Sequence, residues 1–156
     1  MTTKISLPAS YSIKAPEHFY TVMDHDVALL RDQGSYETCM TVILCCIDAL
    51  AAGPDDADRN KFGAFVKKHF PTLCAELDGA VPGKSGAEVL YDKFRNGFAH
   101  LRGPKSGFAI ANDSELEGRY ATEVEVEGKG NWVAINVDRL INDFRQVVAV
   151  LGRGAA

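Results

Sequence analysis

The chain has 156 residues, 46% of them hydrophobic and 24% charged, a composition typical of one ordinary globular domain. Its net charge of −4 argues against a protein that coats nucleic acid without specificity. No apolar run is long enough to span a bilayer, and the first residues do not have the pattern of a signal peptide. We therefore expect a cytoplasmic protein with no membrane contact.

Three helices are predicted in the first half of the chain. Residues 13–34 contain a helix with Pro16 in its first turn and Gly34 just past its end. Residues 35–52 form a second helix, capped by Ser35 and apolar nearly all round, so it should be central and buried. Residues 54–71 form a third helix that Pro71 stops.

Cysteine and histidine spacing gives little sign of a metal or disulfide site. The four cysteines form no CxxC pair and no regular framework, so we expect small, reduced core residues: Cys39, Cys45, Cys46 and Cys74. His18 and His25 share a face of the first helix, but a metal ion would need further ligands. We predict no metal and no cofactor.

After a loop at residues 77–86, the segment 87–101 is predicted as a further helix, which we call the motif helix. Its apolar residues recur at helical spacing and predict a core-facing stripe: Ala87, Leu90, Tyr91, Phe94, Phe98 and Leu101. Gly97 lies inside it and costs about 1 kcal/mol relative to alanine. A helix that contains such a glycine often needs something to approach its backbone closely.

The period then changes from helical to alternating. Residues 107–112 are a short strand candidate, and residues 120–138 alternate on both sides of Gly128-Lys129-Gly130, which predicts a hairpin whose glutamates face water. Residues 138–151 return to helical spacing. The expected fold is mainly α, with about five helices and a small antiparallel sheet before the C-terminal helix.

Four polar residues of the motif helix lie on the face turned away from the core: Asp92, Arg95, Asn96 and His100. Counted at 100° per residue, Arg95 and His100 are about 140° apart, so they do not meet directly on one helix. They converge only through side-chain length, a break in the helix, or a second copy packed alongside. A plainer interpretation pairs Arg95 with Asp92 and leaves His100 beside the last carbonyls of the helix.

Charge is distributed unevenly around this helix. Residues 84–105 contain five Lys and Arg against two Asp and Glu, a local charge of +3. Residues 106–127 contain one Arg against six Asp and Glu, a local charge of −5. The locally basic segment is therefore the one that holds Arg95 and His100, although short charge runs are usually solvated faces.

The sequence "LYDKFRNGFAHL" resembles the signature of the HEPN superfamily (higher eukaryotes and prokaryotes nucleotide-binding domains). That signature is an arginine, four intervening residues and a histidine, with a polar residue after the arginine. Arg95, Asn96 and His100 match it, and Pro104 lies in a loop similar to the family's. The resemblance implies one HEPN-like helical bundle over residues 1–156, in which the hairpin region, residues 106–137, is an insertion.

What the resemblance implies for function is metal-independent RNA cleavage, as in toxin–antitoxin and phage-defence proteins. His100 would exchange protons with the ribose 2′-hydroxyl or the leaving oxygen, and Arg95 would bind the phosphate. Asn96, Arg102 and Lys105 are the expected substrate-binding residues. The expected partners are an RNA substrate, a second copy joined through the motif helix, and a cognate antitoxin.

Two alternatives stay open. Many HEPN-like domains keep the fold without cleavage, so the chain is alternatively a noncatalytic binding or scaffold module of unknown ligand. A bundle unrelated to the family, with a merely solvated polar face, is the other. The last alternative predicts a monomer in which residues 95 and 100 lie far from any cleft.

Overall fold

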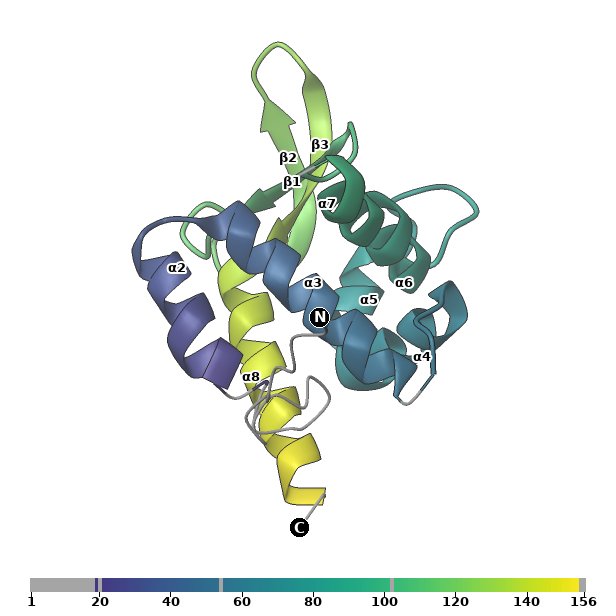
Figure 1. Cartoon of the computed structure of the whole chain (residues 1–156). Coiled ribbons are helices and arrows are strands. Elements are labelled where there is room, and N and C mark those ends of the chain that lie inside the picture. The colour runs from purple at the N-terminus through teal and green to yellow at the C-terminus, as the bar shows by residue number, and fades with distance from the viewer. Residues whose placement is uncertain (1–18, 20, 54, 102, 155–156) are drawn as a thin grey trace, which may run out of the picture.

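The computed structural model describes residues 19, 21–53, 55–101 and 103–154, which form a helical body with a small sheet at one end (Figure 1). The prediction of a mainly helical fold with a small sheet before the C-terminal helix is confirmed. Within these ranges, no helix combines the length and the apolar character needed to cross a bilayer.

The first predicted helix is confirmed over its second half. It contains a wide π-helical segment, η2 (Val22–Val27), followed by α2 (Ala28–Asp32). Met23 and Val27 are buried. Its predicted start, with Pro16 and His18, lies outside the described residues.

Helix α3 (Tyr36–Ala52) is the central helix of the body, as predicted. It contacts α2, α4, α7 and α8, and its core side chains are fully buried: Cys39, Met40, Ile43, Leu44 and Ile47. Ser35 precedes the helix at the N-cap position, as predicted, but its side chain makes no capping hydrogen bond. The Ser35 backbone, at φ −82° and ψ 60°, departs from the extended conformation that a capping residue usually adopts.

Pro71 marks a junction between two helices. It ends α4 (Arg59–His69) as predicted, but it also begins α5 (Pro71–Leu77), a helix that was not predicted. Proline suits the first position of a helix because its φ is preset and the first N–H has no helical partner. Leu73, Cys74 and Leu77 bury the inner face of α5.

The sheet has three strands in the order β1-β3-β2. Strands β2 (Ala121–Val126) and β3 (Gly130–Asn136) form the predicted antiparallel hairpin, which projects beyond the helices (Figure 1). The expectation of a wholly antiparallel sheet is wrong, because β1 (Phe108–Ala111) pairs parallel to β3. This pairing lets Phe108 pack edge-on against Phe94 of the motif helix, with ring centroids 5.5 Å apart.

The C-terminal helix α8 (Val137–Gly154) follows β3 without a loop and packs on α3. Its predicted apolar stripe is largely buried: Leu140, Ile141, Phe144, Val147 and Val148. On the hairpin, Glu123, Glu125 and Glu127 are exposed, as predicted.

Candidate functional site

The motif helix consists of three continuous segments: α6 (Gly86–Val89), η3 (Leu90–Arg95) and α7 (Asn96–Leu101). It begins with a capping box, in which the Ser85 N–H donates to Glu88 Oε2 over 2.8 Å and the Glu88 N–H donates to Ser85 Oγ over 3.4 Å. Four of the six predicted stripe residues are buried: Ala87, Leu90, Phe94 and Phe98. Tyr91 is half-buried against the core. Leu101, predicted to end the stripe, is 66% exposed because it lies beyond the edge of the core.

The middle of the motif helix is wound more widely than an α-helix. In η3 the Asn96 N–H donates to the Tyr91 carbonyl, five residues back, whereas an α-helical N–H donates to the carbonyl four residues back. Arg95 is the last residue of this segment. Segments of this kind occur frequently at functional sites.

Arg95 is held by a buried carboxylate from α3. Its Nε donates to Asp48 Oδ2 over 2.9 Å, its Nη2 donates to the same oxygen, and its Nη1 donates to Asn96 Oδ1 over 2.9 Å. The guanidinium lies 5.2 Å from the centre of the Tyr91 ring. Burial acts to lower the pKa of Arg95, but the hydrogen bond and charge of Asp48 outweigh it and raise that pKa above its ordinary value.

Asp48 is a functional candidate that the sequence analysis missed. It is only 8% exposed, and its Oδ1 is buried without a hydrogen-bond partner among the described residues. A carboxylate is seldom buried unless it is paired. A charged residue inside the apolar run of residues 42–52 was the available signal, because such a residue predicts a cationic partner nearby.

The expected pair between Arg95 and Asp92 is wrong. Asp92 instead binds Lys84 and also Arg59 of α4, whose Nη2 lies 3.1 Å from Asp92 Oδ2. Widening of η3 changes the spacing between residues three apart, and α3 supplies a better-buried carboxylate for Arg95. The two acidic groups therefore connect the motif helix to two different helices.

Gly97 has the role that its position predicted. A Cβ placed on it would lie 2.5 Å from the Gly103 carbonyl oxygen, so only glycine fits. Here the chain leaving the helix folds back across it, and the Lys105 N–H donates to the Lys93 carbonyl over 2.9 Å. This contact holds the half-exposed Lys105 beside the motif helix. Arg102, the other predicted basic contact, lies outside the described residues.

His100 is exposed near the end of α7. It lies five α-helical steps after Arg95, so the two side chains leave the helix about 140° apart. In the part of the chain that the structure describes, the partners of Arg95 are Asp48, Asn96 and Tyr91. One chain thus brings Arg95 and Asn96 together but does not bring His100 to them.

The cysteine prediction is confirmed for two residues and wrong for a third. Cys39 and Cys74 are buried, whereas Cys45 is exposed. Although the Cys45 side chain reaches solvent, the protein atoms around its thiol partly desolvate it and raise its pKa. The nearby Arg95 charge opposes this shift only in part. Burial raises the pKa of Cys46 to about 12. Neither thiol has the lowered pKa of a reactive cysteine.

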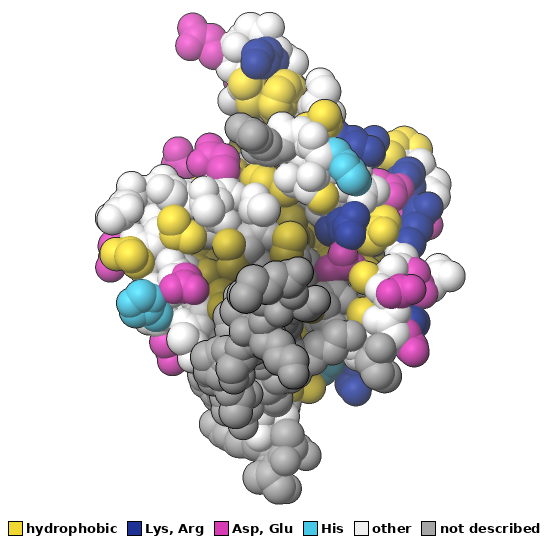
Figure 2. Space-filling view, in the orientation of Figure 1, with side chains coloured by type: hydrophobic (Ala, Val, Ile, Leu, Met, Phe, Trp, Pro, Cys, Tyr) yellow, Lys and Arg dark blue, Asp and Glu magenta, His cyan; other side chains and the backbone are white. Residues whose placement is uncertain are grey.

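Basic side chains gather around the motif helix. Figure 2 shows Lys and Arg over α7 and α6, whereas the region over α2 carries Asp, Glu and apolar side chains.

His25, considered above as a metal ligand, lies in η2, where its Nδ1 pairs with Asp26 Oδ1 at 2.8 Å. Among the described residues, no three His, Cys, Asp or Glu side chains are grouped to hold a metal ion.

Comparison with known proteins finds no matching family model, no matching curated protein and no matching solved structure. The candidate site therefore has to be interpreted from its own geometry. That geometry is a cation fixed by a buried carboxylate, an exposed imidazole on the same helix, and a basic surface around both.

Proposed function

We propose that the protein is a metal-independent endoribonuclease of the HEPN type that acts in the cytosol. The observation that carries this proposal is the fixed Arg95 guanidinium, bound by Asp48 and Asn96 while its side chain remains 24% exposed. An arginine held in one orientation at a basic surface is prepared to bind a phosphate without reorganisation.

In this proposal, the ribose 2′-oxygen attacks the adjacent phosphorus and the bond from phosphorus to the 5′-oxygen breaks. The products are a 2′,3′-cyclic phosphate and a free 5′-hydroxyl. His100 accepts the 2′-hydroxyl proton or donates one to the leaving oxygen, as an imidazole does near neutral pH. Arg95 stabilises the charge that the phosphate gains, and Asn96, Lys105 and Arg102 contact the substrate.

The site is completed by a second copy of the chain. Because Arg95 and His100 leave one helix about 140° apart, His100 of one copy transfers protons at the phosphate that is bound by Arg95 of the other copy. Exposed Leu101, at 66%, supplies apolar surface next to His100 for this contact. A toxin–antitoxin role with a small antitoxin protein that covers this cleft accords with the proposal.

A noncatalytic binding module is the second candidate. The observation that favours it is that three guanidinium nitrogens of Arg95 already donate within the chain. The overall charge of −4 also disfavours strong RNA binding. In such a module, Arg95 holds α3 and the motif helix together and His100 contacts a protein or nucleotide ligand.

The test is incubation of the purified protein with a mixed RNA pool in a metal chelator, with end analysis of the products. We expect 2′,3′-cyclic phosphate ends, and at least about 100-fold slower cleavage by both Arg95→Ala and His100→Ala. This is the range for losing a donor that stabilises transition-state charge in the first variant and a general acid–base group in the second. His25→Ala is the matched control, because His25 is also exposed but lies in η2. Equal cleavage by all variants would exclude the catalytic assignment.

Light scattering should accompany this assay. A dimer of the wild type that persists in His100→Ala separates loss of chemistry from loss of assembly. A protein that stays monomeric at assay concentration and still cleaves RNA would contradict the shared site. A dimer that never cleaves would favour the binding module.

A further inference from the structure

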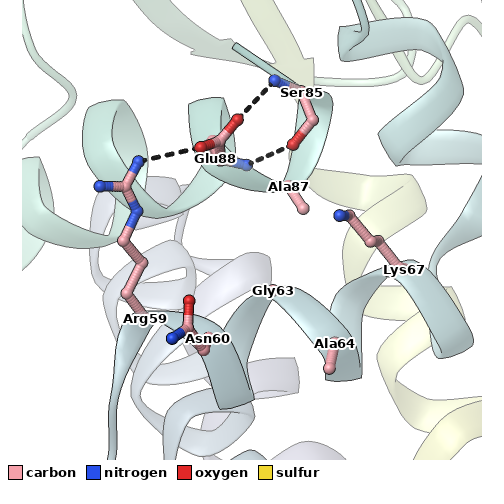
Figure 3. Close-up of a pocket in the computed structure, with 8 residues that line it drawn as sticks. All are labelled: Arg59, Asn60, Gly63, Ala64, Lys67, Ser85, Ala87 and Glu88. Atoms are coloured by element: carbon pink, nitrogen blue, oxygen red, sulfur yellow. Dashed lines mark hydrogen bonds and ion pairs between the residues drawn. The ribbon is translucent and has the colours of Figure 1, made fainter.

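A groove lies between α4 and the start of the motif helix, with a volume of about 470 Å³ (Figure 3). One side is a single face of α4, formed by residues 59, 60, 63, 64 and 67, and the other side is Ser85, Ala87 and Glu88. This volume is in the range of about 300–1,000 Å³ that is usual for ligand sites.

The groove is open in the middle of its α4 side because Gly63 and Ala64 are small. A Cβ on Gly63 would meet no atom within 4 Å, so packing between helices does not require a glycine there. Glycine inside a helix still costs about 1 kcal/mol relative to alanine. Gly63 therefore keeps free a space that a larger side chain would fill, and Ala64 and Ala87 continue this low surface.

Cations lie at the two ends of the groove, as Figure 3 shows. At one end, Arg59 Nη2 is 3.3 Å from Glu88 Oε1 and 3.1 Å from Asp92 Oδ2. At the other end, Lys67 is exposed, and no ion pair of it is found within the described ranges. Glu88 is the one carboxylate in the lining, and it is already engaged by Arg59 and by the Ser85 N–H.

The groove and the Arg95 site lie along the same motif helix, and Asp92 is the residue between them that contacts the groove lining. Asp92 binds Arg59 and Lys84 on the groove side and lies three residues before Arg95 in the same helix. Glu88 and Arg95 are seven residues apart on the motif helix. Figure 2 shows several Lys and Arg side chains over α6 and α7, interspersed with Asp and Glu.

The lining is better suited to the sugar–phosphate backbone of a nucleic acid than to one of its bases. Its eight residues include no aromatic ring on which a base would stack. Its polar groups are Lys67, which is unpaired among the described residues, the ion-paired Arg59 and Glu88, an amide and a hydroxyl. An extended polyanion that passes Arg95 would place neighbouring phosphates along α4. A small nucleotide, by contrast, would gain no stacking contact in this groove.

We propose that this groove binds the phosphate backbone of single-stranded RNA, next to the phosphate held at Arg95. Lys67 and Arg59 contact phosphates, and Asn60 and Ser85 offer hydrogen bonds to sugar or phosphate oxygens. The assignment of RNA rests on the proposed function. The groove itself rests on the charges and the open surface of α4.

The test is fluorescence anisotropy with a labelled 2′-O-methyl oligouridine, which has no 2′-hydroxyl and therefore stays intact. We expect Lys67→Glu to weaken binding about tenfold and to reduce the slope of log K against log salt by about 0.7, the value for one phosphate contact on a single strand. Lys68→Glu is the matched control, because it makes the same charge change on an exposed neighbour outside this groove.

A second pair of variants tests the space instead of the charge. Gly63→Leu fills the groove and should weaken binding at least about fivefold, whereas Gly63→Ala should leave it within about twofold. Circular dichroism of both variants establishes that α4 is intact, since open space at Gly63 permits either side chain.

The outcomes separate the two proposals. Equal effects of Lys67→Glu and Lys68→Glu, or unchanged binding in Gly63→Leu, overturn the groove assignment even when the wild type cleaves RNA. Selective binding of polyglutamate, with no binding of oligouridine, also overturns it in favour of an acidic protein. Groove-dependent RNA binding without any cleavage supports the groove and contradicts the nuclease.

Discussion

The motif helix and the β2–β3 hairpin are both two-faced, but their polar faces are organised differently. Polar groups of the motif helix reach other elements: Arg95 binds Asp48 of α3, and Asp92 binds Arg59 of α4. Glu123 and Glu125 of the hairpin stand exposed on an edge strand. Charge on the hairpin keeps an edge strand soluble and prevents it from pairing with other chains, whereas charge on the motif helix holds that helix in place against α3 and α4.

The largest expected stability effect concerns the turn that crosses the motif helix. Gly97→Ala should lower the free energy of unfolding by about 3 kcal/mol, because the new methyl would overlap the Gly103 carbonyl oxygen. Gly63→Ala is the matched control and should raise that free energy by up to about 1 kcal/mol. Urea denaturation measures both. Similar values for the two variants would show that the chain does not cross the helix closely.

Asp48→Ala should cost about 2 kcal/mol, because it leaves the Arg95 guanidinium unpaired where it is only 24% exposed. Asp48→Asn keeps one acceptor and should cost less. The double variant Asp48→Ala with Arg95→Ala should cost less than the sum of the single changes by about 1–2 kcal/mol. Strict additivity in this cycle would contradict the ion pair.

Neutralising the hairpin should have little effect on stability. Changing Glu123, Glu125 and Glu127 each to Gln should alter the free energy of unfolding by less than about 0.5 kcal/mol per residue, because these side chains are exposed. A loss above 1 kcal/mol per residue would show that the hairpin charges are structural, and the contrast with the motif helix would disappear. Retained RNA affinity in the triple variant would further separate the two regions.

The smallest expected effect is a pH dependence at the start of the motif helix. Hydrogen bonds from Ser85 lower the pKa of Glu88 below its ordinary value of 4.5. A carboxylate with a lowered folded-state pKa contributes stability above its unfolded pKa and loses it as pH falls through the folded value. The difference between wild type and Glu88→Gln should therefore shrink below about pH 4.5. A constant difference from pH 7 to pH 3 would contradict the capping box.

Local patterns in the sequence predicted most of the elements. Phe94 and Phe98 at helical spacing gave the motif helix, and Gly128-Lys129-Gly130 gave the hairpin, because these signals act between near neighbours. The parallel pairing of β1 with β3 joins segments far apart in the sequence and accompanies the contact of Phe108 with Phe94, and no local pattern specifies either. Helix α5 was missed because Pro71 both ends one helix and begins the next.

Three residues of the candidate site were predicted from the sequence, but Asp48 and the contacts around Arg95 were missed. Arg95, Asn96 and His100 stand out in the sequence, and Gly97 correctly indicated a close approach. The plainer interpretation paired Arg95 with Asp92 because i, i+3 pairs are common in helices, whereas Asp48 is 47 residues away in sequence. Long-range ion pairs depend on which helices become neighbours, and helix spacing alone does not contain that information.

The chain that crosses Gly97 has a mechanical consequence for the motif helix. The Lys105 N–H donates to the Lys93 carbonyl of η3, and two residues later the Gly107 carbonyl accepts the Val133 N–H over 3.0 Å, so residues 105–107 connect η3 to the middle of β3. We expect a displacement of the projecting hairpin to act through this connection on η3, the segment that ends at Arg95. A molecule bound to the hairpin would then shift the guanidinium without touching it.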